Sequence, residues 1–374
     1  MHAVIVSKRS LQQVTVLGKA LKDYIKEELE PFLKTHIYTI DMDALLEATF
    51  DLDEEEDMLI LPEDVVLYTN RILKESYLKY KKAGSLPTIF HTSTNKSGMI
   101  KKHQICFAWV KLKDLKAYTS LTEFDMLQHF EVSINSVKRV YTVELISEYA
   151  KELEEKIKKH WVKRGIYMMQ PDTVVLGPDV YFLGTAIIQG GAYIWGKTIC
   201  YDSVHIGPNC EIYDSILKEN VRVSHSVIEE SCIGRDSVIG PFAHIRNHTS
   251  IGDGNRIGNF VEVKNSTTGK KTYASHLTYI GDTSCGNGVN FGCGVVTVNY
   301  DGKAKHSTWI GDNAFIGCNS NLIAPIRIES NSFIAAGSTI VTSLHQGDFS
   351  IARPPQIIKK QYAKKYGYKR VDEE

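Results

Sequence analysis

A six-residue repeat in the C-terminal half most constrains what this chain can fold into. A large apolar residue recurs at every sixth position over 176–212, 233–263 and 310–340. A period of six fits neither the 3.6-residue turn of an α-helix nor the two-residue alternation of a simple strand. It fits a short strand followed by a corner, so that three hexads close one triangular coil. We therefore predict an all-β left-handed parallel β-helix over 166–345 rather than a β-sandwich.

Glycine and two interruptions give the repeat its finer detail. Glycine often follows the large residue, as in Ile206-Gly207 and Ile239-Gly240, and we expect it to supply the backbone freedom of the corners. The hexads lose their phase in two polar and basic segments, 264–279 and 292–309. Insertions in a solenoid leave it as loops on one face, which is often the binding face. We expect both segments to be such loops.

The rest of the chain shows no repeat. Its length of 374 residues favours two domains. Residues 1–141 combine strand-like apolar runs at 3–6 and 58–61 with helical spacing at 17–33, which predicts a small α/β domain. Amphipathic spacing over 142–165 predicts one connecting helix. A basic, Tyr-rich tail occupies 346–374.

Charge, hydropathy and cysteine content exclude several classes of protein. The chain has 44 basic and 44 acidic residues, which argues against a nucleic-acid or membrane-surface binder. No apolar run reaches the 18 or so residues that a spanning helix needs, and the N-terminus does not read as a signal peptide. The seven cysteines include no CxxC pair. We expect reduced thiols in a cytoplasmic protein without a membrane or nucleic-acid partner.

Motifs within 158–360 carry a resemblance to a known family. They are IGPFAHIR at 239–246, GNFVEVK at 258–264, HLTYIGD at 276–282, NYDG at 299–302 and IARPPQ at 351–356. In order and spacing they resemble the acetyltransferase domain of the bacterial bifunctional N-acetylglucosamine-1-phosphate uridyltransferase/glucosamine-1-phosphate acetyltransferase family. The resemblance implies a homotrimeric left-handed β-helix with active sites between neighbouring coils. It also implies acetyl-CoA as cosubstrate, glucosamine 1-phosphate as acceptor and no metal for acetyl transfer.

The expected chemistry assigns roles to individual residues. Acetylation requires a neutral amine to attack a thioester, so a group that exchanges protons near neutral pH suits the task, and histidine is the usual choice. His276 matches the family's catalytic base, and Glu262 is the candidate for orienting it. A sugar phosphate needs fixed cations, for which an arginine fork is well suited. Arg246, Lys264 and Lys305 match the family's basic contacts.

Further residues match the substrate contacts of the family. Sugar contacts are expected from Tyr279, Asn290 and Asn299, and cosubstrate contacts from Cys293, Tyr300, Cys318, Ala336 and Arg353. A backbone N–H near Cys293 would stabilise the tetrahedral oxyanion, and Arg353 would face the cosubstrate's phosphates. The chain departs from the family pattern where Cys318 replaces a serine, Cys293 an alanine and Val295 a threonine. Because a thiol is a weaker donor than a hydroxyl, these changes leave the identity of the acyl donor open.

The N-terminal domain departs further from the family. Residues 7–14 contain no glycine where a phosphate-binding loop would bring backbone N–H groups to a triphosphate. Residues 61–64 and 133–135 look like remnants of metal-binding segments, so Asp64 and Asn135 are either a binding vestige or ordinary surface residues. We interpret 1–141 as a shortened, degenerate nucleotidyltransferase-like domain and expect it to lack uridyl transfer.

Three alternatives remain beside the acetyltransferase. One is a non-catalytic scaffold or regulatory protein that has kept the β-helix. Another is an N-acyltransferase of a different amino sugar. A third is a zinc enzyme using His244, His276 and His306, which lack the paired histidines at short spacing of such sites.

Overall fold

The computed structural model describes the C-terminal part of the chain without interruption and the N-terminal part in segments. The described residues are 2–7, 15–16, 19–29, 37–41, 56–62, 65–67, 70–82, 88–92, 104–111, 132–133, 137–139, 143–360 and 362. The chain divides into two compact units. One comprises Met1–His160 with Leu176–Pro178, and the other comprises Trp161–Val175 with Asp179–Glu374.

The first unit contains the expected mixture of strands and helices. Its main sheet has the order β4-β1-β5-β8-β7-β9, with β1 parallel to β4 and β5, and β8 antiparallel to β5 and β7. The strands of that sheet are β1 (His2–Ser7), β4 (Ile37–Asp41), β5 (Asp57–Pro62), β7 (Thr88–Thr92), β8 (Gln104–Lys111) and β9 (Val132–Ser133). Short pairs are β2 (Thr15–Val16) with β3 (Lys19–Ala20), and β6 (Val65–Leu67) with β10 (Val137–Arg139). The helices are α1 (Leu21–Leu29), α2 (Asn70–Lys82) and α5 (Val143–Val162).

A buried carboxylate ties strand β5 to helix α2. Asp57, at the start of β5, accepts hydrogen bonds from the hydroxyls of Tyr77 at 2.7 Å and Tyr80 at 2.9 Å. Lys81 Nζ lies 2.6 Å from the same carboxylate. Burial is the largest single influence and raises the pKa of Asp57, but the contacts from Lys81, Tyr77 and Tyr80 together lower it below its usual value. Asp57 is therefore held in its charged form by this cluster.

Helix α5 occupies the segment in which the sequence predicts a connecting helix. It ends in a turn in which the Gly165 N–H donates to the Val162 carbonyl at 3.1 Å. Gly165 has φ +94°, a conformation that glycine adopts without a Cβ penalty. Trp161, in the last turn of the helix, packs edge-on against Tyr181 and Phe182 of the first coils. Trp161 thus belongs to the packing of the β-helix unit.

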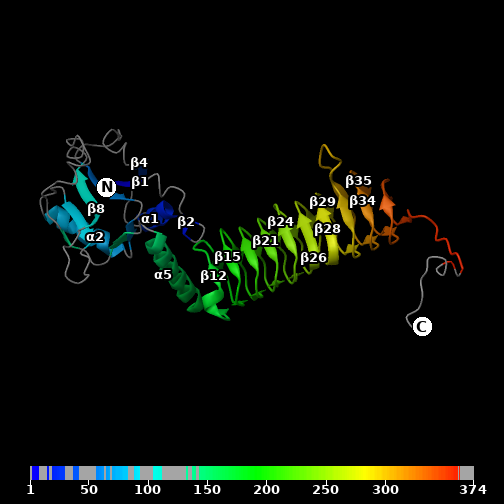
Figure 1. The fold of residues 1–374 in the computed structure, drawn as a ribbon, viewed down its shortest axis with the longest axis horizontal. Coiled ribbons are helices and arrows are strands. Elements are labelled where there is room, and N and C mark those ends of the chain that lie inside the picture. Colours follow the sequence, from blue (N-terminus) through cyan, green and yellow to red (C-terminus); the bar gives the residue numbers. More distant parts are fainter. Residues whose placement is uncertain are drawn as a thin grey trace. The chain divides into compact units, whose positions relative to one another are not determined.

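The second unit is a stack of parallel coils, as predicted, and Figure 1 shows the coils following one another along one axis. Two of its faces form one sheet, in which β26 (Arg256–Lys264) and β28 (Tyr273–Gly281) run across both faces. The first face contains β11 (Ile166–Met168), β14 (Ala186–Ile188), β17 (Val204–Ile206), β20 (Arg222–Val223), β23 (Val238–Ile239), β30 (Asn290–Phe291), β33 (Phe315–Ile316), β36 (Phe333–Ile334) and β38 (Phe349–Ser350). The second contains β12 (Val175–Leu176), β15 (Tyr193–Trp195), β18 (Glu211–Tyr213), β21 (Val227–Glu229), β24 (His244–Arg246), β31 (Val296–Val298), β34 (Asn321–Ile323) and β37 (Thr339–Ile340). The third contains β13 (Tyr181–Phe182), β16 (Ile199–Cys200), β19 (Ile216–Leu217), β22 (Cys232–Ile233), β25 (Ser250–Ile251), β27 (Thr267–Thr268), β29 (Thr283–Cys285), β32 (Thr308–Ile310) and β35 (Ile326–Ile328).

The coils continue through the first gap in the hexad pattern. Between 212 and 233 the interior positions are filled by Leu217, Val223 and Ile228, all of which are buried. Here a coil takes 16 residues, as the pairing of Glu211 with Val227 shows, whereas most other coils take 17 or 18. The apolar column is therefore continuous, and only the spacing at the corners changes. Burial of each isoleucine in this column contributes about 1.5–3 kcal/mol to the stability of the fold.

The expectation of a loop over 264–279 is wrong. This segment forms an ordinary coil through β27 and β28. The pattern is broken because Thr268 occupies the interior position that Ile251 holds one coil earlier. The buried Asn255 side chain donates to Thr268 Oγ1 at 2.6 Å and to the Gly269 carbonyl at 3.0 Å, so both polar groups are satisfied inside the prism. Only the 292–309 segment carries a projecting hairpin, within a coil of 25 residues.

The role expected for the glycines also needs correction. At Gly234, Gly252 and Gly269 the requirement is space, because a Cβ there would lie 2.4 Å from backbone atoms of the next coil. These three have no positive φ, whereas Gly240 does, at +96°. Many of the left-handed corner positions are instead occupied by asparagine and aspartate, which tolerate that conformation better than other side chains do.

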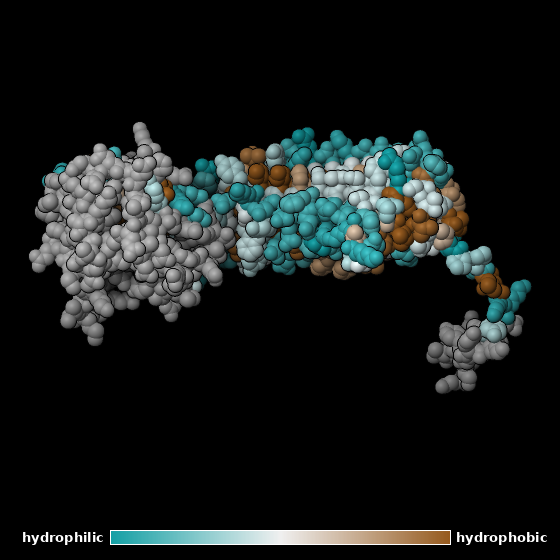
Figure 2. Space-filling model, turned by 90° about the horizontal axis from the view of Figure 1, so that it is seen from above, coloured by the Kyte–Doolittle hydropathy of each residue, from teal (hydrophilic) through white to brown (hydrophobic). Residues whose placement is uncertain are grey.

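Aromatic side chains form an exposed ladder on the first face of the C-terminal coils. Phe315 and Phe333 stack with ring centroids 4.6 Å apart, and Phe333 and Phe349 follow at 5.6 Å. All three are exposed. Figure 2 shows apolar side chains gathered over this end of the β-helix.

Candidate functional site

His276 lies at an exposed corner, in the middle of β28. Its Nδ1 is 2.9 Å from Oδ1 of Asn259, which pairs with it from the preceding coil in β26. An amide oxygen only accepts hydrogen bonds, so with this amide orientation the proton lies on Nδ1 of the neutral ring. Nε2 is then the basic nitrogen. This is the tautomer in which the imidazole can accept a proton from a bound amine.

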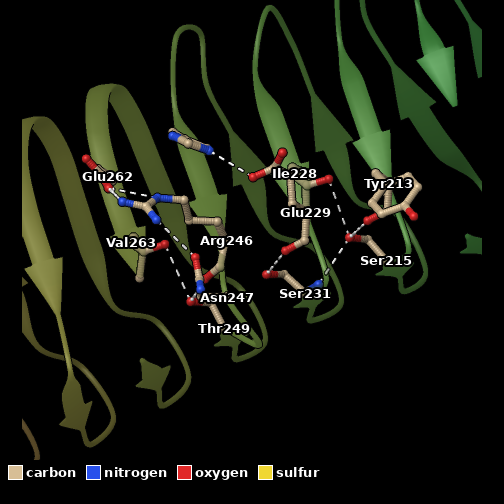
Figure 3. Close-up of polar contacts among 11 residues, drawn as sticks. Tyr213, Ser215, Ile228, Glu229, Ser231, Arg246, Asn247, Thr249, Glu262 and Val263 are labelled. Carbon is tan, nitrogen blue, oxygen red and sulfur yellow. Dashed lines mark hydrogen bonds and ion pairs between the residues drawn. The ribbon is translucent and has the colours of Figure 1, made fainter. Parts of the chain in front are cut away.

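Glu262 has a different partner from the one expected. Its Oε1 lies 2.6 Å from Arg246 Nη2 and 3.0 Å from Arg246 Nε (Figure 3). The sequence-based pairing of Glu262 with His276 is thus not what the structure forms, because Asn259 takes that place. Asn259 was missed although it lies in the GNFVEVK motif, 17 residues before His276. One coil length would have pointed to it.

Arg246 is held from several sides in β24. Besides Glu262, its guanidinium contacts Asn247 Oδ1 at 3.0 Å. The Thr249 hydroxyl donates to the Arg246 carbonyl at 2.7 Å and so fixes the corner that follows the strand (Figure 3). A guanidinium oriented in this way is prepared to bind an anion with little loss of side-chain freedom.

Two further cationic side chains, Lys264 and Lys305, gather next to this arginine. Lys264 pairs in register with Arg246 on the adjacent coil. The neighbouring Lys305 side chain is the main cause that lowers the pKa of Lys264; desolvation and the charge of Arg246 act in the same direction, and Asp282 opposes them. The crowding of positive charge means that a bound anion would relieve repulsion as well as form ion pairs.

The hairpin places Lys305 next to Lys264. Tyr300 and Lys305 form an isolated antiparallel bridge. Asp301 accepts hydrogen bonds from the backbone N–H groups of Lys303 and Ala304 at 2.8 Å, and it contacts His306 Nε2 at 2.7 Å. These contacts hold the pKa of Asp301 well below its usual value. The conformation of the hairpin is therefore held by hydrogen bonds among its own residues.

Two of the expected sugar contacts lie at the base of the hairpin. Asn299 is buried, and its Nδ2 donates to Asp282 Oδ2 at 2.5 Å and lies 3.4 Å from the Tyr279 hydroxyl. Tyr279 pairs in register with Glu262 of the preceding coil. Asn299 and Tyr279 thus belong to the same group as the three cations. Asn290 lies outside this group, in β30 on the first face.

The expected cosubstrate contacts follow His276 along the same corner. The Gly294 N–H donates to the Leu277 carbonyl, Asn319 to Cys293, and Gly337 to Cys318, at 2.7–2.8 Å. His276, Cys293, Cys318 and Ala336 therefore occupy equivalent places on successive coils. Arg353 Nη1 donates to the Ala336 carbonyl at 2.8 Å and extends the line. The site residues thus form two groups, one of cations and polar side chains and one along this corner. Strand β28 contributes to both, with Tyr279 in the first group and His276 in the second.

The histidines of the zinc alternative are not brought together. His244 contacts Glu229 at 3.3 Å, His306 contacts Asp301, and His276 contacts Asn259. Within the described ranges, no group of three or more His, Cys, Asp or Glu side chains is arranged to hold a metal ion.

No helix among the described residues is long and apolar enough to cross a membrane. Asp64, Asn135 and most of the 7–14 segment lie outside the described residues.

Family models match two stretches of the β-helix. The GMPPB C-terminal domain matches residues 176–290, and the bacterial transferase hexapeptide (six repeats) matches residues 307–342. A solved structure of LpxA, a UDP-N-acetylglucosamine acyltransferase from Bacteroides fragilis, covers 41% of this chain and 66% of its own with a TM-score of 0.33 and 19% identity. At that level the fold assignment depends on the coils themselves and on the hexapeptide match.

Curated relatives with the name "Bifunctional protein GlmU" match more strongly. The protein of Acholeplasma laidlawii is 50% identical over 219 residues, 59% of this chain and 48% of the relative. That of Clostridium novyi is 43% identical over 241 residues, 64% of this chain and 53% of the relative. That of Acetivibrio thermocellus is 38% identical over 277 residues, 70% of this chain and 60% of the relative. The resemblance seen in the motifs is thereby confirmed, and the chain spans about half the length of the curated relatives that it matches.

Proposed function

We propose that this chain is an acetyl-CoA-dependent N-acetyltransferase of an amino sugar phosphate, with glucosamine 1-phosphate as its acceptor. The premise is its similarity to the GlmU proteins. The observation that carries the proposal is the position of His276. It shares a corner with Cys293, Cys318 and Ala336, and it shares strand β28 with Tyr279, which belongs to the group of the three cations. A base beside an anion-binding cluster is what transfer to the amine of a sugar phosphate requires.

In the proposed reaction, the amine nitrogen of the acceptor attacks the thioester carbonyl carbon, and His276 Nε2 takes a proton from that amine. The C–S bond then breaks, and the proton passes from the imidazole to the leaving thiolate. A backbone N–H near Cys293 stabilises the oxyanion of the tetrahedral intermediate. General acid–base catalysis of this kind contributes about 10²–10⁴-fold to the rate.

Substrate binding divides between the two groups of residues. Arg246, Lys264 and Lys305 bind the phosphate of the acceptor. The sugar is contacted by Tyr279, Asn290 and Asn299. Cosubstrate binding is assigned to Cys293, Tyr300, Cys318, Ala336 and Arg353, with Arg353 toward the phosphates of acetyl-CoA. No metal takes part in this scheme.

The chain is proposed to act as a homotrimer. The exposed Phe315–Phe333–Phe349 ladder supports this proposal, because a stack of apolar rings on a flat face is stabilised when a second copy covers it. Size-exclusion chromatography with light scattering tests the assembly. A charged residue in place of Phe333 would weaken it.

The decisive experiment measures thiol release from acetyl-CoA by the purified chain. Glucosamine 1-phosphate should support turnover well above glucosamine and glucosamine 6-phosphate, and His276→Ala should reduce it about 100-fold or more. The control is His205→Ala, since His205 lies on an N-terminal coil in contact with Gln189. Turnover with another amino sugar only would favour the alternative acceptor, and no turnover with any would favour the scaffold. For the N-terminal unit, we propose that incubation with UTP and N-acetylglucosamine 1-phosphate releases no pyrophosphate.

A further inference from the structure

Two thiols lie level with each other on neighbouring coils, at the corner that carries His276. Cys293 and Cys318 are both free and exposed. The Asn319 N–H donates to the Cys293 carbonyl at 2.8 Å, so the two coils are in direct contact at this point. Adjacent strands lie about 4.8 Å apart, which falls within the Cα separation of about 4.4–6.8 Å that disulfides span.

The Cys318 side chain leans toward the coil of Cys293. The residue before Cys293 is Gly292, and a Cβ placed there would lie 2.9 Å from Cys318 Sγ. The thiol therefore occupies the space that the missing side chain of Gly292 leaves open. Bringing the two sulfur atoms together requires side-chain rotation at an exposed corner rather than movement of the core.

The two thiols differ from the cysteines inside the prism. Burial raises the pKa of Cys200 and Cys285 to about 12, and that of Cys210 to about 11. Thiols that are buried and protonated in this way react slowly with oxidants. Exposed thiols do not have this protection.

We infer that Cys293 and Cys318 are a modification site that closes reversibly to a disulfide and blocks the cosubstrate side of the site. With a small disulfide as oxidant, one cysteine thiolate attacks it and releases a thiolate, and the second cysteine displaces the other half. One S–S bond forms and one breaks, and the two protons end on the released thiols. The effect on activity rests on the proposed function, whereas the disulfide itself does not.

The chemical test treats the full chain with diamide, whose N=N bond takes up the two thiol hydrogens, then alkylates the remaining thiols and maps peptides by mass spectrometry. A Cys293–Cys318 cross-linked peptide should form and should disappear after dithiothreitol. It should be absent in Cys293→Ala and Cys318→Ser, and present in the control Cys232→Ser. Alkylation of both cysteines after diamide, or cross-links to other cysteines in their place, would overturn the inference.

The functional test compares turnover before and after diamide within each protein. The wild-type chain and Cys232→Ser should lose activity that dithiothreitol restores, while each single variant keeps its own starting activity. A cross-linked chain with full activity would overturn the claim that the disulfide blocks the site. If the reduced chain has no activity, the proposed function fails, and peptide mapping still decides whether the disulfide forms.

Discussion

Asn259 and His276 pair across adjacent coils, with the amide oxygen 2.9 Å from the imidazole Nδ1. Through this contact the Asn259 amide oxygen sets the tautomer of His276, with the proton on Nδ1. Because Asn259 lies in the strand that also carries Glu262 and Lys264, the orientation of the His276 ring depends on the same register that aligns Lys264 with Arg246.

Replacing Asn259 should change the pH dependence of the reaction. In Asn259→Asp, a carboxylate next to the imidazole stabilises its protonated form. The acid limb of the pH–rate profile should therefore move to higher pH, and Asn259→Ala should lower kcat about tenfold without moving the limb in that direction. The control is Asn209→Asp, a corner asparagine on an N-terminal coil. A profile in Asn259→Asp that matches the wild type would contradict the positioning role.

Glu262→Gln separates the two roles that this residue has been assigned. As the partner of Arg246, its loss should raise the KM for the sugar phosphate about 10- to 150-fold, which corresponds to a charged hydrogen bond of about 1.5–3 kcal/mol. It should leave the shape of the pH profile unchanged. A shifted acid limb with normal KM would instead restore the expected pairing of Glu262 with His276. Steady-state kinetics at several pH values decides between them.

The Lys305 side chain should contribute to binding only when the acceptor carries a phosphate. Lys305→Ala removes one of three cations and should raise the KM for the phosphorylated acceptor about tenfold. Any turnover of unphosphorylated glucosamine should change little, and the difference should shrink at high salt. Lys303→Ala, in the same hairpin, is the matched control. Equal losses with both acceptors would argue for a structural role of Lys305.

The Asp57 cluster should make the stability of the N-terminal unit depend on pH. Its pKa is lowered in the folded state from the ordinary 3.8, so its contribution is present above that value and is lost as the pH falls through the lowered pKa. Asp57→Asn should destabilise the unit by about 1–3 kcal/mol, because the Tyr77 and Tyr80 hydroxyls lose a charged acceptor. Denaturant unfolding of wild type and variant at neutral and acidic pH measures both effects. An acid transition that is the same in both would contradict the role of Asp57.

Much of the site could be predicted from motifs, but not its internal contacts. The motifs named Arg246, Lys264 and Lys305 as basic contacts, and the structure places these three side chains next to one another. The motifs gave His276 the wrong partner. Position in sequence does not show whether the neighbouring coil has 16, 17, 18 or 25 residues, and one residue more or less changes which side chains stand opposite each other.

The sequence by itself determined the architecture of the C-terminal half. A hexad of buried aliphatic residues closes into a triangular coil whatever the surface residues are, because burial of that column dominates the folding free energy. Only the tertiary structure decided that 264–279 is a coil. Thr268 is tolerated inside the prism because its hydroxyl oxygen accepts a hydrogen bond from the Asn255 side chain. The tertiary structure likewise decided the pairs Asn259–His276 and Glu262–Arg246. Contacts between coils depend on the exact length of every turn, which a repeating pattern alone leaves undetermined.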